Sequence, residues 1–219
     1  MPLDDRARLI ASPVVAHSEH SRDTRTPASR GVRTLVLGGA RSGKSAHAES
    51  LFATLPDSVN VRYLATARRR PEDTDWEDRI DGHRRRRPIH WTVVETAHRG
   101  GLVEELTRTD WSATLVDDLG TWLTDVIDRA NAWDRPRGTV AADIDALVDR
   151  VHTYPHDLVL VTPEVGLAVV PESRSGRLFR DEIGALNARL AHECDRVVLI
   201  VAGLPLVLKD SPSPTEGRS

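Results

Sequence analysis

The sequence has little that could form covalent or metal cross-links. Among its 219 residues there is a single cysteine, Cys194, which excludes an intrachain disulfide and a cysteine-based metal cluster. The apolar neighbours Leu190, Ala191 and Val197 indicate that this cysteine is a small buried residue.

Lysine is almost as scarce as cysteine. Only Lys44 and Lys209 are present, so arginine carries nearly all of the positive charge. The formal net charge is −3, which excludes a global basic field of the kind that attracts nucleic acid. We therefore expect no nucleic-acid partner, and the scarcity of lysine makes Lys44 conspicuous.

Long apolar runs are also missing. None approaches the ~18 residues that a membrane-spanning helix needs. The first residues include Asp4 and Asp5 and contain no apolar signal segment. We expect a cytoplasmic protein without a membrane span.

The two ends differ in composition from the centre. Residues 1–31 mix Arg, Ser, Thr, Pro and acidic residues, and residues 210–219 are rich in Ser, Pro and Gly. Both segments are predicted to be disordered. Residues 32–209 remain as one folded domain, in a chain whose 39% hydrophobic and 29% charged residues are ordinary for a globular protein.

Strand-like and helix-like segments alternate within this domain. Strands are predicted at 32–37, 59–65, 91–95, 114–118, 158–162 and 197–202. Helices are predicted at 44–55, 73–87, 102–107, 121–131, 140–151 and 178–194. Apolar strands separated by helices are typical of a mostly parallel sheet covered on both faces. The predicted fold class is an α/β three-layer domain.

A phosphate-binding loop follows the first predicted strand. The segment Gly38-Gly39-Ala40-Arg41-Ser42-Gly43-Lys44-Ser45 fits G-x-x-x-x-G-K-[ST] at every fixed position. Its glycines allow backbone N–H groups to surround the β- and γ-phosphates, and the following helix adds its positive end. Lys44 would neutralise the phosphates, and the Ser45 hydroxyl would ligate Mg²⁺. The alternative is a glycine-rich turn that matches by chance.

An acidic partner for the metal is expected at the end of a neighbouring strand. The strand at 114–118 runs directly into Asp117 and Asp118, and we favour Asp117 as the group near Mg²⁺. The alternative is that Asp118 caps the next helix while Asp117 is merely solvated.

A histidine lies beside an arginine cluster. His83 is followed by Arg84, Arg85, Arg86 and Arg87, an unusual run in an acidic chain that favours an anion site such as a triphosphate. A neutral imidazole is a competent nucleophile towards phosphorus. From the residues alone, a solvated basic helix end or a core histidine remains open.

Read in order, the motifs resemble the bifunctional adenosylcobinamide kinase/adenosylcobinamide-phosphate guanylyltransferase family of cobalamin biosynthesis. The matching segments are LVLGGARSGKSAHAE (35–49), YLATA (63–67), RIDGHRRRRPIHW (79–91), LVDDLGTWLTD (115–125), VTPEVGLAVVPE (161–172), GRLFRDEIGALNARLA (176–191) and AGLPLVLK (202–209). They cover about residues 32–209. The histidine segment and the Glu-Val-Gly…Val-Pro-Glu…Phe-Arg-Asp string are more restrictive than the phosphate loop.

The resemblance implies a two-step enzyme with a RecA-like P-loop fold, assembled as a homotrimer. ATP or GTP would phosphorylate adenosylcobinamide, and His83 would then attack the α-phosphorus of GTP. The GMP would pass to adenosylcobinamide phosphate, giving adenosylcobinamide-GDP. The nucleotide contacts implied by the resemblance are Gly38–Ser45, Ala65, Thr66, Ala67, Arg84–Arg87, Glu95 and Asp117.

The chain departs from the family pattern at three positions. Pro163 stands where Asn is usual, Asp118 where Cys is frequent, and Asp125 where Asn is frequent. Two other functions compete with the bifunctional enzyme: a small-molecule kinase without nucleotidyl transfer, and a GTP-binding switch that transfers nothing. Neither needs a nucleophilic histidine at position 83.

Overall fold

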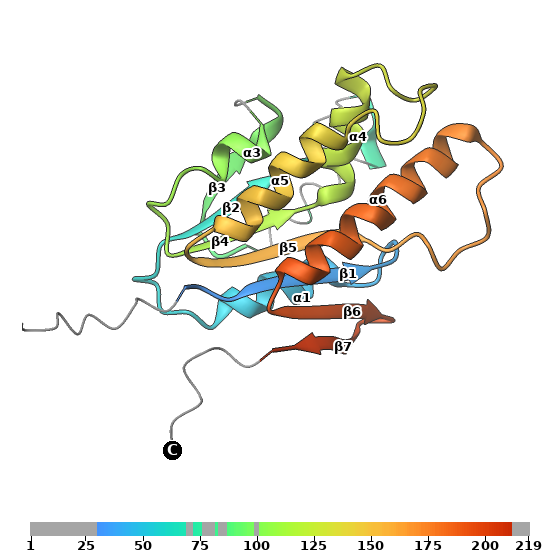
Figure 1. Ribbon diagram of the computed structural model, residues 1–219. Coiled ribbons are helices and arrows are strands. Elements are labelled where there is room, and N and C mark those ends of the chain that lie inside the picture. The colour runs from blue at the N-terminus through green and yellow to red at the C-terminus, as the bar shows by residue number, and fades with distance from the viewer. Residues whose placement is uncertain (1–29, 69–71, 76–81, 83–86, 99–100, 212–219) are drawn as a thin grey trace, which may run out of the picture.

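The computed structural model describes residues 30–68, 72–75, 82, 87–98 and 101–211 (Figure 1). Most of the predicted helix at 73–87, including His83, lies outside these residues, as does nearly all of the two predicted disordered ends. The two remaining residues of the N-terminal segment, Arg30 and Gly31, are in contact with the fold: Arg30 pairs with Asp195, and the Gly31 amide donates to the Pro155 carbonyl.

A seven-stranded sheet forms the centre of the molecule, in the order β3-β2-β4-β5-β1-β6-β7. The strands are β1 (Arg33–Gly38), β2 (Val61–Ala65), β3 (Thr92–Glu95), β4 (Ala113–Asp117), β5 (Asp157–Pro163), β6 (Arg196–Val201) and β7 (Leu204–Asp210). All neighbouring strands are parallel except β6 and β7. The parallel order places the carboxyl ends of β1 to β6 along one edge of the sheet.

Helices cover both faces of this sheet (Figure 1). They are α1 (Lys44–Ala53), α3 (Leu102–Glu105), α4 (Leu119–Arg129), α5 (Ala141–Thr153) and α6 (Arg174–Glu193), and a 3-10 turn η1 (Thr96–His98) follows β3. Helix α1 packs on one face, where Phe52 joins Tyr63 and Trp91 in a core cluster. Helices α3 to α6 cover the other face with a larger apolar cluster. The expected three-layer α/β P-loop fold is therefore confirmed.

The described elements agree with the predicted ones to within a few residues, but β7 has no counterpart among the predicted strands. It forms a tight hairpin with β6 through Ala202 and Gly203, which both have positive φ (51° and 81°), as in the primed two-residue turns. Asp210, predicted to open the disordered tail, is the last residue of this strand. Pro205 and the unbroken apolar run around it do not show the alternation typical of a strand. A proline is tolerated in a strand where its missing N–H needs no partner, as on an edge strand.

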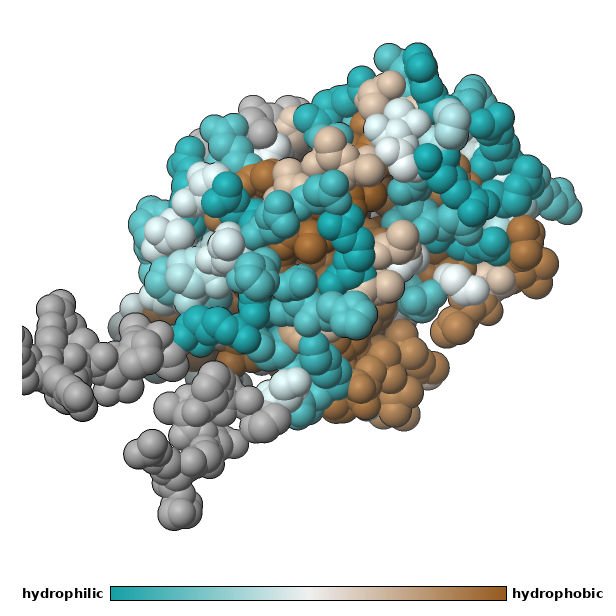
Figure 2. Space-filling model, in the orientation of Figure 1, coloured by the Kyte–Doolittle hydropathy of each residue, from teal (hydrophilic) through white to brown (hydrophobic). Residues whose placement is uncertain are grey.

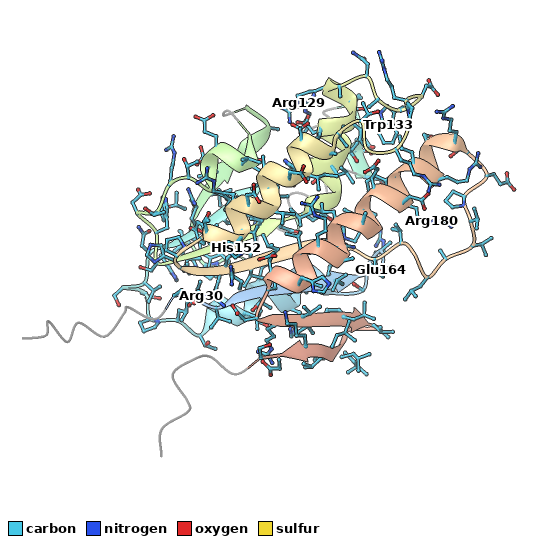
Figure 3. The ribbon with its side chains drawn as sticks, in the orientation of Figure 1. Arg30, Arg129, Trp133, His152, Glu164 and Arg180 are labelled. Carbon is cyan, nitrogen blue, oxygen red and sulfur yellow. The ribbon has the colours of Figure 1, made fainter. Side chains whose placement is uncertain are left out.

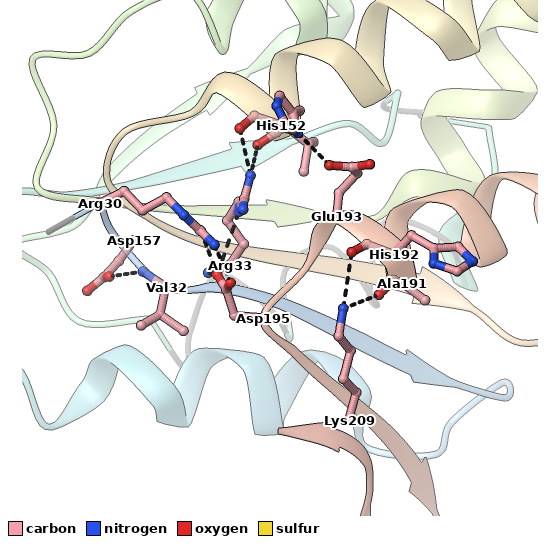
Figure 4. A network of polar contacts seen from close by, with 11 residues as sticks. Arg30, Val32, Arg33, His152, Asp157, Ala191, His192, Glu193, Asp195 and Lys209 are labelled. Atoms are coloured by element: carbon pink, nitrogen blue, oxygen red, sulfur yellow. Dashed lines mark hydrogen bonds and ion pairs between the residues drawn. The ribbon is translucent and has the colours of Figure 1, made fainter. Parts of the chain in front are cut away.

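A polar network fastens the amino ends of the strands (Figure 4). Arg30 donates to both carboxylate oxygens of Asp195, which also accepts from the Arg33 amide. The Arg33 guanidinium donates to the carbonyls of Val151 and His152 at the end of α5. These bonds link the first strand to the carboxyl-terminal ends of two helices, at the edge of the sheet away from the phosphate loop.

Cys194 is buried at the end of α6, as expected. Burial raises the pKa of its thiol to about 12, so it stays protonated and unreactive at neutral pH. None of the helices in the described part of the chain combines the length and apolar character that a bilayer crossing requires.

Candidate nucleotide-binding site

The predicted phosphate loop joins the fully buried strand β1 to helix α1. There is little room for a side chain at Gly38, because a Cβ there would lie 2.3 Å from the Ser42 Oγ and 3.1 Å from the Ile200 carbonyl oxygen. Gly43 caps α1 in a left-handed conformation with φ of 92°, which favours glycine as well. The N-terminus of α1 therefore lies at the carboxyl edge of the sheet, the geometry that holds phosphate groups.

Lys44 begins α1 and folds back over this loop. Its Nζ lies 3.4 Å from the Gly39 carbonyl oxygen. A flexible ammonium in this place can turn from the carbonyl to a bound phosphate without any movement of the backbone.

Asp117 faces the phosphate loop from the end of β4. The Ser45 hydroxyl donates to its Oδ1 at 3.1 Å, and the Tyr63 hydroxyl donates to its Oδ2 at 2.5 Å. Asp117 is thus held in contact with the loop, which excludes the alternative that it is merely solvated.

Asp118, by contrast, belongs to the structure of α4. Its carboxylate accepts from the Thr121 amide at 2.9 Å, so it is the N-cap of that helix. Burial raises the pKa of Asp118, and the negative charge of Asp117 adds to this rise. The Thr66 hydroxyl donates to the Asp118 carbonyl oxygen at 2.6 Å, which ties the end of β2 to the same corner.

Tyr63 is a site residue that the sequence reasoning missed. It lies in the middle of β2 and is fully buried, and its hydroxyl fixes the orientation of Asp117. Burial, followed by the charge of Asp117, raises the pKa of Tyr63 well above its ordinary value, so the hydroxyl remains a donor. Only the pairing of β2 with β4 reveals this contact, because the two residues are 54 positions apart.

Arg87 is the one described member of the arginine run, and its side chain contacts Tyr63. Its guanidinium carbon lies 3.5 Å from the centroid of the Tyr63 ring, a stacked cation–π contact. His83 and Arg84 to Arg86 lie outside the described residues. The structure therefore places the end of the predicted basic segment against Tyr63, the residue whose hydroxyl donates to Asp117.

The remaining predicted contacts lie further along the same edge. Ala65 ends β2 and pairs with Asp117 on one side and with Glu95 of β3 on the other. Thr66 and Ala67 follow directly. Ala65 and Glu95 thus share the carboxyl edge with the phosphate loop, but β5, β4 and β2 separate Glu95 from the loop strand.

The oxygen donors at the loop fit Mg²⁺. Ser45 and Asp117 provide one hydroxyl and one carboxylate within 3.1 Å of each other. Within the residues that the structure describes, no group of three or more His, Cys, Asp or Glu side chains forms a metal site. A partial set of hard oxygens suits a cation that keeps water and phosphate ligands, as Mg²⁺ does beside a nucleotide.

The three departures from the family pattern are each accommodated locally. Asp118 is the helix cap described above. Asp125 forms ion pairs with Arg68 and Arg129. Pro163 lies over Gly120, where an added Cβ would meet the proline ring at 2.7 Å, and its carbonyl accepts from Asn187 at 3.0 Å.

The strand–loop–helix geometry, with Asp117 on a parallel strand beyond β5, defines a P-loop nucleotide-binding protein of the α/β class. Sequence comparison specifies the family. A family model described as "Cobinamide kinase / cobinamide phosphate guanyltransferase" matches residues 34–208. The chain belongs to this family.

Two relatives support the assignment. The chain is 38% identical over 181 residues to the bifunctional adenosylcobalamin biosynthesis protein CobP of Pseudomonas aeruginosa, covering 83% of this chain and 99% of that protein. It is also 38% identical over 186 residues to the bifunctional adenosylcobalamin biosynthesis protein CobU of Escherichia coli K12, covering 80% and 98% of the two chains.

A solved structure, the VirB11 ATPase of Brucella suis, is 13% identical with a TM-score of 0.41, over 81% of this chain and 48% of that one.

Proposed function

We propose that this protein phosphorylates adenosylcobinamide with a nucleoside triphosphate and then transfers GMP from GTP to the product, giving adenosylcobinamide-GDP. The observation that carries the proposal is the contact between Ser45 of the phosphate loop and Asp117. Family membership adds the identity of the substrate and of the second reaction.

In the first step, the amides of Gly38–Ser45 hold the β- and γ-phosphates of ATP or GTP. Lys44 neutralises the charge that develops on them, and Tyr63 keeps Asp117 turned towards Ser45. Mg²⁺ bound by Ser45 and Asp117 would neutralise phosphate charge as the γ-phosphoryl group is transferred.

In the second step, His83 attacks the α-phosphorus of GTP and pyrophosphate leaves. The resulting phosphoramidate is reactive enough to pass GMP to a phosphate oxygen of adenosylcobinamide phosphate, which regenerates His83. Arg84, Arg85, Arg86 and Arg87 would hold the phosphates during this exchange. The position of Arg87 over Tyr63 supports a shared phosphate-binding region for the two steps. Ala65, Thr66, Ala67 and Glu95 are proposed to contact the nucleotide.

The assembly we propose is a homotrimer. The outward side of the β6–β7 hairpin exposes an apolar patch, seen in brown beside the lower edge of the sheet in Figure 2. Leu204 and Leu206 are 71% and 54% exposed there, and β7 is an edge strand of the sheet formed by the described residues. A surface of this kind favours contact with other copies of the chain. We also propose a cytoplasmic location, because the nucleoside triphosphates that both steps consume are cytoplasmic metabolites.

The proposed second step is tested by labelling. Incubation with GTP labelled at the α-phosphate should give a covalent protein label that is acid-labile and alkali-stable, as a phosphoramidate is. His83→Ala should abolish this label while adenosylcobinamide is still phosphorylated. His192→Ala is the matched control, because His192 is exposed at the far end of α6 and should leave both reactions unchanged (Figure 4).

The same assay separates the competing functions. A kinase without nucleotidyl transfer would phosphorylate adenosylcobinamide and take no α-label. A GTP-binding switch would bind GTP and do neither. A label that persists in His83→Ala would overturn the assignment of the nucleophile.

A further inference from the structure

A cavity of about 430 Å³ lies beside the phosphate loop, on the side facing β6. Its walls are Gly39–Ser42 of the loop, Leu167 and Ala168 of the segment after β5, and the end of β6 at 199–202. Glu164 completes the lining. The walls are thus mostly apolar or backbone, with Arg41 and Glu164 as the only titratable side chains lining the cavity within the described residues.

Glu164 is positioned by the order of the strands. It follows β5, which lies between the loop strand β1 and the Asp117 strand β4. Its amide donates to the Gly38 carbonyl at 3.1 Å, so its backbone is attached to the first residue of the phosphate loop. Figure 3 shows Glu164 at the opposite end of the sheet from Arg30 and His152. The backbone of Glu164 thus lies between the strand of the phosphate loop and the strand of Asp117, the two groups proposed to hold the γ-phosphate and its Mg²⁺.

The Glu164 carboxylate is oriented by a hydrogen bond, and among the described residues it forms no ion pair. Its Oε1 accepts from the Gly166 amide at 2.6 Å, which makes a short turn of the segment 164–166. Among the described residues, Oε2 has no hydrogen-bond partner. Arg41, the other titratable side chain of the cavity lining, cannot accept a proton at any physiological pH. Glu164 is thus the one described group at this cavity that can accept a proton from a substrate.

From these observations we propose that the cavity receives the alcohol-bearing arm of the acceptor and that Glu164 is the catalytic base of the kinase step. The inference rests on the proposed kinase function. Oε2 of Glu164 takes the proton of the acceptor hydroxyl as its oxygen attacks the γ-phosphorus. The bond between the γ-phosphorus and the β–γ bridging oxygen breaks, and the nucleoside diphosphate leaves with that electron pair. Glu164 then releases its proton to water.

Replacement of the carboxylate by an amide tests the base. Glu164→Gln keeps the shape and the acceptor oxygen for Gly166, so the fold should persist. The kcat for phosphorylation of adenosylcobinamide should fall about 10²–10⁴-fold, the usual contribution of a general base. The KM for the nucleotide should stay unchanged, as should the α-label from GTP. Glu172→Gln, an exposed neighbour on the same segment, should behave like the wild type.

A second variant tests the cavity independently of the base. Ala168→Phe should fill part of the lining and raise the KM for adenosylcobinamide by about tenfold or more, with the KM for the nucleotide unchanged. An unchanged kcat in Glu164→Gln together with an unchanged acceptor KM in Ala168→Phe would overturn the inference while the wild-type enzyme remains active. Absence of phosphorylation by the wild type would instead overturn the proposed function itself.

Discussion

The two lysines of the chain lie at opposite ends of the sheet and have different roles. Lys44 begins α1 at the carboxyl edge, with its ammonium over the phosphate loop. Lys209 lies at the amino edge, where its Nζ donates to the Ala191 and His192 carbonyls at the end of α6. A cation at the last turn of a helix satisfies free carbonyls and interacts favourably with the helix dipole.

This division gives a matched pair of variants. Lys44→Ala should lower kcat for the kinase step by ~10²–10³-fold, because it removes a charge that acts on the transferred phosphoryl group. Lys209→Ala should retain full activity and lose ~0.3–1 kcal/mol of unfolding free energy. Steady-state kinetics and urea denaturation measure the two effects. Equal activity in both variants would contradict the role given to Lys44.

At the scale of elements, the first strand is fastened at both ends by contacts distant in the sequence. At its carboxyl end the Gly38 carbonyl accepts from the Glu164 amide, and its amino end is held through Asp195 (Figure 4). Partial burial raises the pKa of Asp195, but hydrogen bonds from Arg30 and Arg33 outweigh this effect and leave the pKa below its ordinary value. The ionised form is therefore favoured in the folded protein.

This shift predicts a pH-dependent contribution to stability. A carboxylate with a lowered folded pKa stabilises the fold above the ordinary Asp value of 3.8, and the contribution is lost as pH falls through the folded pKa. Asp195→Asn should therefore be less stable than the wild type at pH 7. The difference in unfolding free energy between the two proteins should shrink as the pH falls below 3.8, as measured by urea denaturation across pH. A difference that is constant with pH would mean that the charge of Asp195 contributes nothing.

In the whole molecule, the turn of the apolar hairpin borders the site, since the Gly203 amide donates to the Ser42 carbonyl at 3.0 Å, whereas the exposed edge strand β7 lies outside it. The nucleotide-binding groups follow the carboxyl ends of the parallel strands, where ligands bind in open α/β folds. The antiparallel hairpin adds an exposed edge of Leu204, Leu206, Val207 and Leu208. An exposed apolar edge strand promotes aggregation of a monomer, but it can form the interface of an assembly.

The proposed homotrimer is tested at this edge. Leu206→Glu should reduce the mass measured by light scattering from that of a trimer towards that of a monomer, because burial of an unpaired charge at an interface is costly. Val93→Glu, at an exposed apolar position on the opposite edge strand β3, should leave the trimer intact. A monomeric wild type, or dissociation in Val93→Glu alone, would refute the proposed interface.

The features that depend on neighbouring residues could be predicted from the sequence alone. The loop at Gly38–Ser45, the buried strands and the carboxylate at the end of β4 could all be read locally, because glycine spacing and apolar periodicity constrain the backbone over a few residues. Tertiary structure decided the rest. Tyr63 reaches Asp117 only because β2 pairs with β4, and Glu164 reaches Gly38 only because β5 is the neighbour of β1. Strand pairing depends on packing between distant segments, which no local pattern specifies.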